Sequence, residues 1–194
     1  MNICVYGASS DAIDKIYIKA GERLGEEMAK RGHTLVFGGG AAGLMGAVAR
    51  GMSRQNGKII GIAPSFFDVD GVLFDKCTEF IYTETMRERK QLLEDMSDAF
   101  IMSPGGIGTY EEFFEVLTLK QLRRHNKPIA ILNTNGYYTP MDALLNETAK
   151  NGFMREESLG LYEICVEVND ILEYIENYIP IEYDINNMKH LGRA

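Results

Sequence analysis

Short apolar runs alternate with segments of helical periodicity along almost the whole chain. The runs, each ending at glycine, proline or polar residues, predict seven strands at residues 2–6, 33–37, 58–63, 79–82, 99–102, 129–132 and 163–168. Apolar residues recurring every three or four positions predict helices at about 13–30, 85–96, 109–123, 138–150 and 170–178, and a short one ending near residue 53. Residues 65–78 have no clean period, and we expect a loop near the functional site there.

Regular alternation of strand and helix predicts an α/β fold with a Rossmann-like, doubly wound parallel sheet of about seven strands and helices on both faces. The sequence has no linker or repeat, so we expect one domain over residues 1–180 and a loosely ordered C-terminal tail over 181–194. Such sheets bind ligands at the carboxyl ends of their strands. Four turns should lie there: 7–11, 38–46, 84–90 and 104–112.

The turn at 104–112 reads Pro-Gly-Gly-Ile-Gly-Thr-Tyr-Glu-Glu and joins a predicted strand to a predicted helix. Its three glycines let the backbone approach a ligand and adopt positive φ, and the unpaired N–H groups of the new helix favour an anion. The turn therefore predicts a phosphate-binding site. Glu111 and Glu112 oppose a bound phosphate unless they serve another part of the ligand.

Two simpler interpretations compete with a catalytic one. Thr109 and Glu112 have the spacing of a capping box, in which the Glu112 side chain would only accept from the backbone of Thr109. Thr85 and Glu88 have the same spacing. Arg89, in the next turn along the predicted edge, would be either a partner for Glu112 or, with Lys90, a solvated basic pair on a helix surface.

A second glycine-rich turn, at 38–46, matches the spacing of a dinucleotide fingerprint at Gly38, Gly40 and Gly43. That fingerprint normally follows the first strand and is followed about 20 residues later by an acid that holds the ribose. Residues 58–63 contain no acid, so NAD binding is disfavoured. The glycines would then either permit tight packing or share in a nucleotide pocket. The chain has no Walker loop.

Composition narrows the class of ligand. The net charge of -8 disfavours DNA or RNA, so a bound phosphate should belong to a small molecule. Three dispersed cysteines and three dispersed histidines predict buried thiols in a reducing compartment and no metal site. With neither a membrane-length apolar run nor a basic leader, we expect a cytoplasmic protein without membrane contact. The helix at 110–122 has apolar residues around more than one face, so it is either enclosed within the monomer or forms part of a subunit interface, and we expect a homodimer.

The turn at 104–112 resembles the PGGxGTxxE signature of the LOG (LONELY GUY) family of cytokinin riboside 5′-monophosphate phosphoribohydrolases. Residues 86–90, Met-Arg-Glu-Arg-Lys, resemble the MHxRK segment of that family, with Arg87 in the usual place of His. Residues 38–46 contribute a GGGxxGLMG run, and Ile107 replaces a frequent Tyr. The family has also been labelled lysine decarboxylase-like, although nothing in this sequence marks a pyridoxal-phosphate site.

The resemblance implies hydrolysis of the N-glycosidic bond of AMP or an N6-modified AMP, without a cofactor. It implies that Glu112 is the catalytic carboxylate and Arg89 its catalytic partner, while Gly105, Gly106, Gly108 and Thr109 hold the phosphate. We expect further substrate contacts from Ser9, Gly40, Met86, Lys90 and Glu111. A non-catalytic nucleotide-binding or sensor protein is the alternative, and it would not require the pair of Arg89 and Glu112.

Overall fold

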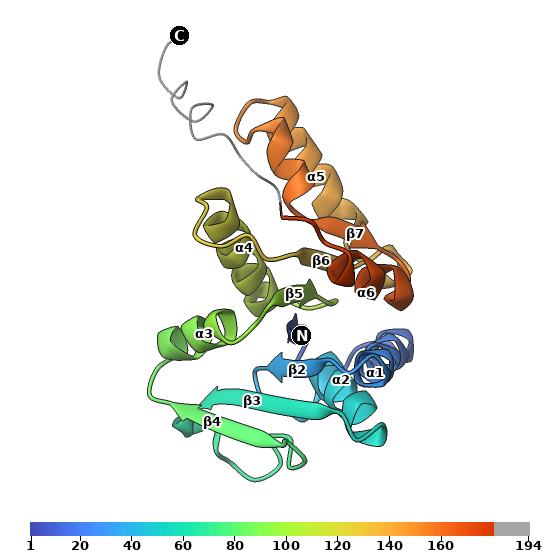
Figure 1. Cartoon of the computed structure of the whole chain (residues 1–194), viewed down its shortest axis with the longest axis vertical. Helices are drawn as coiled ribbons and strands as arrows, with labels where there is room; N and C mark the ends of the chain where they lie inside the picture. Colours follow the sequence, from blue (N-terminus) through green and yellow to red (C-terminus); the bar gives the residue numbers. More distant parts are fainter. Residues whose placement is uncertain (181–194) are drawn as a thin grey trace.

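Strands and helices alternate in the computed structural model, which describes residues 1–180 (Figure 1). The strands are β1 (Asn2–Tyr6), β2 (Thr34–Phe37), β3 (Lys58–Pro64), β4 (Glu79–Thr83), β5 (Ala99–Met102), β6 (Ile129–Leu132) and β7 (Glu163–Cys165). The α-helices are α1 (Lys15–Lys30), α2 (Gly43–Arg54), α3 (Met86–Asp95), α4 (Ile107–Gln121), α5 (Thr139–Lys150) and α6 (Val168–Glu176). The predicted tail at 181–194 lies outside the described residues.

All seven strands form one parallel sheet in the order β4-β3-β2-β1-β5-β6-β7, which confirms the doubly wound fold. The chain first builds outward from β1 to β4 and then returns to the other side of β1 with β5. The order therefore reverses between β1 and β5. Ligands of open α/β sheets bind beyond the strand ends at such a switch point.

Alternate residues of each strand point to opposite faces of the sheet, and each face has its own apolar core. Ile3 and Val5 pack with α1, α2 and α6, whereas Cys4 and Tyr6 pack with α3, α4 and α5. Figure 1 shows α1, α2 and α6 together on the right of the sheet and α3 and α4 on its left. Burial on both faces explains why the strand sequences are continuously apolar.

The last strand was predicted too long. We expected residues 163–168, but β7 ends at Cys165, Val166 is exposed, and α6 already begins at Val168. Helix α4 likewise begins two residues before the expected Thr109. Short 3-10 helices at Ser65–Phe67, Thr134–Gly136 and Glu156–Leu161 carry no periodic signal of their own.

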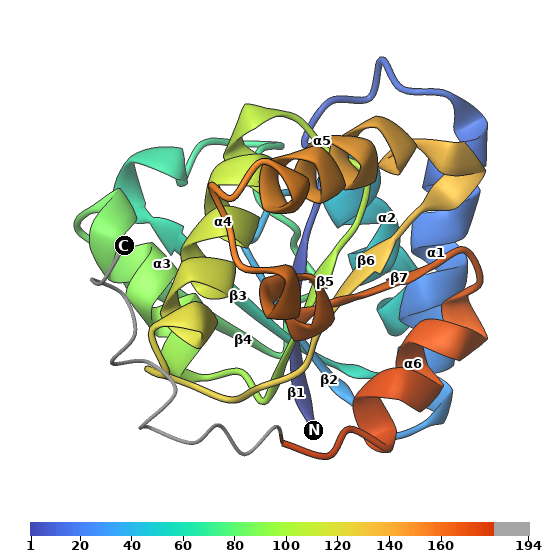
Figure 2. The same ribbon diagram turned by 90° about the horizontal axis from the view of Figure 1, so that it is seen from above.

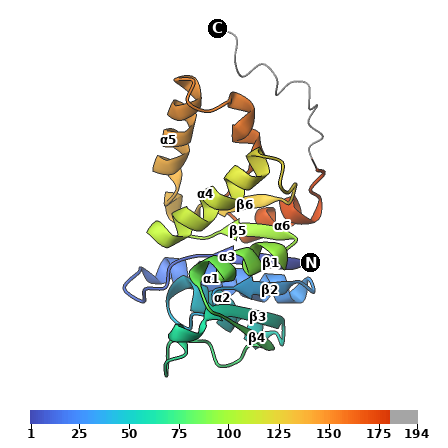
Figure 3. The ribbon, with the colours of Figure 1, turned by 90° about the vertical axis from the view of Figure 1, so that its left-hand side faces the viewer.

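The carboxyl edge of the sheet gathers segments that are distant in sequence. Figure 2 shows the loop between β1 and α1 at the same edge as the beginning of α4. The backbone connects the two, because the Ala8 N–H donates to the Pro104 carbonyl at 3.0 Å. From the side, α3 and α4 lie next to each other in front of the sheet (Figure 3). Within residues 1–180, no helix is long and apolar enough to cross a bilayer.

Candidate active site

A buried ion pair lies between α3 and α4. The Arg89 guanidinium donates from Nη1 to Glu112 Oε1 at 3.0 Å, and less than a tenth of either residue is exposed. Burial raises the pKa of the Glu112 carboxyl above its ordinary value, although the charge of Arg89 acts in the opposite direction. The carboxylate is thus oriented by arginine and largely shielded from water. Glu112 does not cap Thr109, so the capping-box interpretation of this residue is wrong.

The start of α3 determines which face of the helix carries Arg89. Thr85 precedes α3, and its Oγ1 accepts from the Glu88 N–H at 3.2 Å while Glu88 Oε2 accepts from the Glu84 N–H at 2.9 Å. The predicted cap at Thr85 is therefore confirmed. Since the helix begins at Met86, Arg89 lies one turn later on the face toward α4.

The end of β2 leaves space for the arginine. A Cβ atom on Gly38 would lie 2.1 Å from Arg89 Nη2 and 3.1 Å from its Cζ. Any larger residue at this position would displace the guanidinium. The sequence interpretation considered the glycines of this turn either for tight packing or for a nucleotide pocket. At Gly38 the missing side chain makes room for the Arg89 guanidinium from α3.

Lys90 is also engaged. Its ammonium forms ion pairs with Glu111, and with Glu115 at 2.8 Å, so one lysine joins α3 to two carboxylates of α4. Partial burial lowers the pKa of Lys90, but the two ion pairs outweigh burial and the net direction is upward. The interpretation of Arg89 and Lys90 as a solvated basic pair is wrong, because Arg89 is buried and Lys90 is paired.

The turn after β5 presents an open helix N-terminus. Gly106 is the N-cap of α4 and offers no side chain, and a Cβ atom on Gly106 or Gly108 would meet nothing within 4 Å. At Gly105, by contrast, a Cβ atom would lie 2.1 Å from Thr109 Oγ1. None of the three glycines has positive φ, so that part of the prediction is wrong. Gly106 and Gly108 provide open space, and Gly105 allows close packing against Thr109.

The turn after β2 is closed by the protein itself. The Gly43 N–H donates to Asp11 Oδ1 at 2.7 Å, and the next two N–H groups, of Leu44 and Met45, donate to the Ala8 carbonyl at 2.9 and 3.1 Å. Helix α2 therefore has its first N–H groups occupied by the loop after β1. This leaves no room for the pyrophosphate contact that a dinucleotide fingerprint requires.

The other predicted contact residues surround this edge. Ser9 is exposed in the loop after β1, Gly40 forms an isolated bridge with Leu73, and Met86 is 42% exposed at the start of α3. Thr109 is buried beneath the turn. Glu111 is exposed, and its carboxylate pairs with Lys90. Leu73 brings the loop at 65–78 next to Gly40, and its place near a functional site stays a prediction.

Uncharged residues of β1 lie on the same face as the ion pair. Tyr6 and Cys4 are buried, and burial raises the pKa of both, to about 12 for the Cys4 thiol. The field of Glu112 adds to this upward direction in each case. Because Cys4 and Tyr6 stay neutral, the negative charge of Glu112 is balanced mainly by the positive charge of Arg89.

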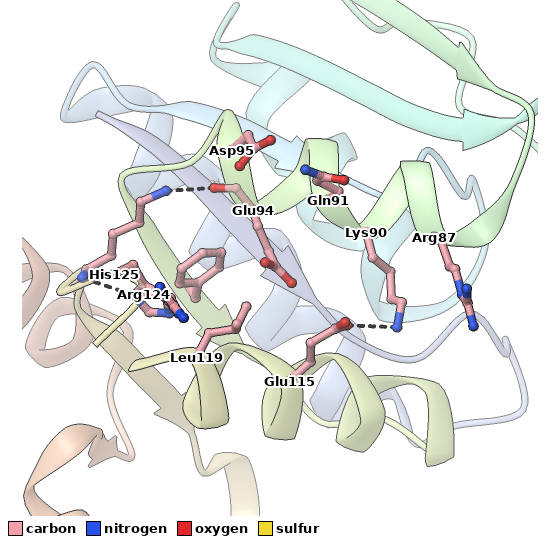
Figure 4. Close-up of a pocket in the computed structure, with 11 residues that line it drawn as sticks. Arg87, Lys90, Gln91, Glu94, Asp95, Glu115, Leu119, Arg124 and His125 are labelled. Atoms are coloured by element: carbon pink, nitrogen blue, oxygen red, sulfur yellow. Dashed lines mark hydrogen bonds and ion pairs between the residues drawn. The ribbon is translucent and has the colours of Figure 1, made fainter. Parts of the chain in front are cut away.

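A cavity of about 700 Å³ lies between α3 and α4 (Figure 4). Arg87, Lys90 and Glu94 line it from α3, and Glu115 faces them from α4. Burial, and then the nearby Glu115 charge, raise the pKa of Glu94 to about 7. Arg87, which replaces the usual histidine of the MHxRK segment, therefore lines the same cavity as Lys90.

Similarity to known proteins extends over nearly the whole chain. The family model described as possible lysine decarboxylase matches residues 45–175. A probable cytokinin riboside 5′-monophosphate phosphoribohydrolase of Oryza sativa subsp. japonica is 34% identical over 96% of this chain and 76% of its own length. The chain belongs to the LOG family. A LOG protein of Arabidopsis thaliana, named cytokinin riboside 5′-monophosphate phosphoribohydrolase, is 32% identical over 92% of this chain and 84% of its own.

Solved structures confirm the fold of this LOG-family chain. A molybdenum cofactor binding protein from Rippkaea orientalis superimposes with a TM-score of 0.70 at 23% identity, covering 90% of this chain and 94% of that one. The molybdenum cofactor carrier protein of Chlamydomonas reinhardtii gives 0.68 at 20% identity, over 90% and 95%. At these identities the likeness concerns architecture alone.

Sequence reasoning missed the contribution of the turn after β6. Tyr137 and Tyr138 donate their hydroxyl groups to the carbonyls of Gly105 and Ser103, both at 2.8 Å. This fifth turn also lies at the carboxyl edge, so the rule that selected the other four would have included it. No motif marks the two tyrosines.

Proposed function

We propose that this LOG-family protein hydrolyses the N-glycosidic bond of a purine nucleoside 5′-monophosphate, AMP or an N6-modified AMP, to release the base and ribose 5-phosphate. The observation that carries the proposal is the buried pair of Arg89 and Glu112 within the first turns of α3 and α4, beside an open glycine turn. The activity named for the rice and Arabidopsis relatives supports the same chemistry.

Glu112 acts on the sugar in this proposal. Cleavage of the bond between C1′ and the base nitrogen develops positive charge on the sugar ring, which a nearby carboxylate stabilises. The oxygen of water forms the new bond to C1′, and the base leaves with the electron pair of the broken bond and takes up a proton. Arg89 keeps the carboxylate ionised and oriented despite its burial.

The glycine turn holds the 5′-phosphate. Gly106 and Gly108 leave space for phosphate oxygens, and Gly105, packed against Thr109, shapes the turn around them. The first N–H groups of α4, including that of Thr109, donate to the phosphate. Phosphate binding at the beginning of α4 leaves Glu112, one turn further on, beside the sugar. Helix α4 would thus bind the phosphate with its first N–H groups and contact the sugar with Glu112.

The remaining contacts come from the neighbouring turns. Ser9, Gly40 and Met86 approach the nucleotide from the ends of β1, β2 and β4. Lys90 and Glu111, which pair with each other, contact the substrate at the groove between α3 and α4. Arg87 in place of the usual histidine alters the charge available to the base.

We further propose a cytoplasmic homodimer that acts on a small molecule and contacts neither nucleic acid nor membrane. Helix α4 exposes Phe114 next to its buried face, and Leu122 after its end is 60% exposed. These apolar residues and the groove in front of α3 and α4 supply a surface for a second copy. The net charge of -8 opposes binding to a polyanion.

Turnover of defined nucleotides tests the function. AMP and N6-isopentenyl-AMP are incubated with the wild type, Glu112→Gln, Arg89→Ala and the control Glu147→Gln, which alters an exposed carboxylate of α5. Free base and ribose 5-phosphate are quantified. We expect both products from the wild type and the control, and a loss of about 100-fold or more in the two pair variants. Binding of nucleotides without release of base by the wild type would instead support a non-catalytic sensor.

A further inference from the structure

Protein donors fix the carbonyl groups of the turn between β5 and α4. The carbonyls at 103–105 accept hydrogen bonds from donors in two different turns, and the Tyr138 hydroxyl also lies close enough to the Gly105 carbonyl to affect its own pKa. The hydrogen bonds run from Tyr138 Oη to Ser103 at 2.8 Å, from the Ala8 N–H to Pro104 at 3.0 Å and from Tyr137 Oη to Gly105 at 2.8 Å. The carbonyl oxygens are therefore turned toward the protein and away from an incoming anion.

The bond from Tyr137 acts on the most adaptable peptide of the turn. The peptide between Gly105 and Gly106 is flanked by glycine on both sides, so side chains present no barrier to its rotation. Rotation by a half turn would exchange the N–H of Gly106 for the carbonyl of Gly105. A carbonyl in that position would repel a phosphate, whereas an N–H binds it.

The trans peptide bond couples the two groups. With the Gly105 carbonyl bonded to the Tyr137 hydroxyl, the Gly106 N–H must point in the opposite direction. We infer that Tyr137 is a positioning residue, which holds this peptide in the orientation that binds phosphate. The inference rests on the proposed function for the identity of the anion.

Aromatic packing holds the Tyr137 ring independently of its hydroxyl. The ring meets Tyr138 edge-on with 4.9 Å between centroids and Tyr17 with 5.8 Å. Tyr137 is 38% exposed, whereas Tyr138 is fully buried. Tyr137→Phe therefore removes the hydrogen bond to Gly105, and the interaction of the Tyr137 hydroxyl with that of Tyr110, and it keeps the ring contacts.

The test measures ribose 5-phosphate affinity by calorimetry on the full chain, separately from turnover. We expect the dissociation constant of Tyr137→Phe to rise about five- to tenfold, the loss typical of one hydrogen bond. The control is Tyr17→Phe, because the Tyr17 hydroxyl has no hydrogen-bond partner within residues 1–180 and its ring touches the same tyrosine. Its affinity and unfolding temperature should match those of the wild type.

A second measurement follows the Gly106 amide by NMR as ribose 5-phosphate is added. We expect the chemical shift of this amide to change strongly in the wild type and weakly in Tyr137→Phe. Ribose without phosphate should leave the chemical shift unchanged in both proteins. Equal ribose 5-phosphate affinity in Tyr137→Phe and wild type would overturn the inference, as would an equal loss in Tyr17→Phe. These readouts need no catalysis, so a wild type that binds ribose 5-phosphate but releases no base refutes the proposed function alone.

Discussion

The turns after β2 and after β5 are both rich in glycine and both lead directly into a helix, but the protein uses the two helix ends differently. At α2, Asp11 and the Ala8 carbonyl occupy the first N–H groups. At α4, the N-cap is Gly106 and no side chain caps the helix. The turn after β2 has the glycine spacing of a dinucleotide fingerprint, yet it is the turn after β5 whose helix N–H groups have no side-chain acceptor within residues 1–180.

Glycine spacing alone therefore does not identify an anion site. Gly43 has a φ of +62°, and a Cβ atom there would lie 2.4 Å from the Ala8 carbonyl, so this glycine allows one protein segment to cross another. Gly106 and Gly108 face open space instead. What distinguishes a phosphate site from a packing site is the partner that the N–H groups already have.

The strongest test concerns Gly38, the glycine of the β2 turn that makes room for the Arg89 guanidinium. In Gly38→Ala, the new methyl group would displace the Arg89 guanidinium from Glu112. We expect kcat for AMP to fall about 100-fold, as misplacement by about 1 Å costs in other enzymes. Steady-state kinetics check this, with ribose 5-phosphate affinity as the control that should stay unchanged. Full activity would mean that the β2 turn contributes nothing to the site.

Gly43→Ala should affect stability more than binding. The left-handed backbone conformation and the close Ala8 carbonyl together should lower the free energy of unfolding by about 2–3 kcal/mol. Urea denaturation measures this loss. Among molecules that remain folded, affinity for ribose 5-phosphate should be within about twofold of the wild type, because α2 does not supply the phosphate contacts.

Gly108→Ala should show the reverse pattern. Its methyl group enters open space at the start of α4, so the free energy of unfolding should stay constant or rise by up to about 1 kcal/mol. The same methyl group occupies space assigned to phosphate, and we expect about a fivefold weaker affinity for ribose 5-phosphate. Calorimetry and urea denaturation on one preparation give both values. Unchanged affinity would move the phosphate away from this turn.

Asp11 offers a smaller test of the closed turn. Asp11→Ala removes the acceptor of the Gly43 N–H and should cost about 1 kcal/mol of stability, the usual loss for a helix cap. Asp11→Asn retains an acceptor oxygen and should recover most of it. Thermal unfolding of the two variants provides the comparison. Equal destabilisation would indicate that the charge of Asp11, and not its hydrogen bond, matters at α2.

The pH dependence of kcat gives the smallest expected change. Activity should fall on acidification as Glu112 becomes protonated, and burial places this fall at a higher pH than for an ordinary glutamate. Glu111 adds to the upward direction and Lys90 opposes it. Glu111→Gln removes the Glu111 charge and leaves Lys90 paired with Glu115 alone, so the acid limb of the kcat profile should move to lower pH by a few tenths of a unit. A shift to higher pH would contradict this account.

The sequence was sufficient for the sheet because each strand is an isolated apolar run between turn residues. It was less exact where local signals overlap: Val166 continues an apolar pattern, yet the chain has already left the sheet. Arg89 and Glu112 were found together because both lie within recognisable motifs. Their mutual contact, together with an N-cap at Gly106, excludes the capping interpretation of Glu112, which spacing alone left open.

The supporting residues could not be predicted because their roles depend on distant parts of the chain. Gly38 matters through a side chain 51 positions later, and Tyr137 through a carbonyl 32 positions earlier. The glycines at 105–108 have ordinary φ angles, which the sequence could not reveal. Periodicity describes neighbours along one element, whereas these contacts arise only when separate strands meet at the switch point.

The position of Tyr137 and Tyr138 after β6 also determines the order in which parts of the proposed site can form during synthesis. During synthesis, Ala8, Arg89 and Glu112 all leave the ribosome before Tyr137. A nascent chain that ends within β6 contains both charged residues but lacks the hydroxyl that holds the Gly105 carbonyl. The charged pair is therefore available to an incomplete chain, whereas the anchored turn belongs only to a chain that has reached its fifth helix.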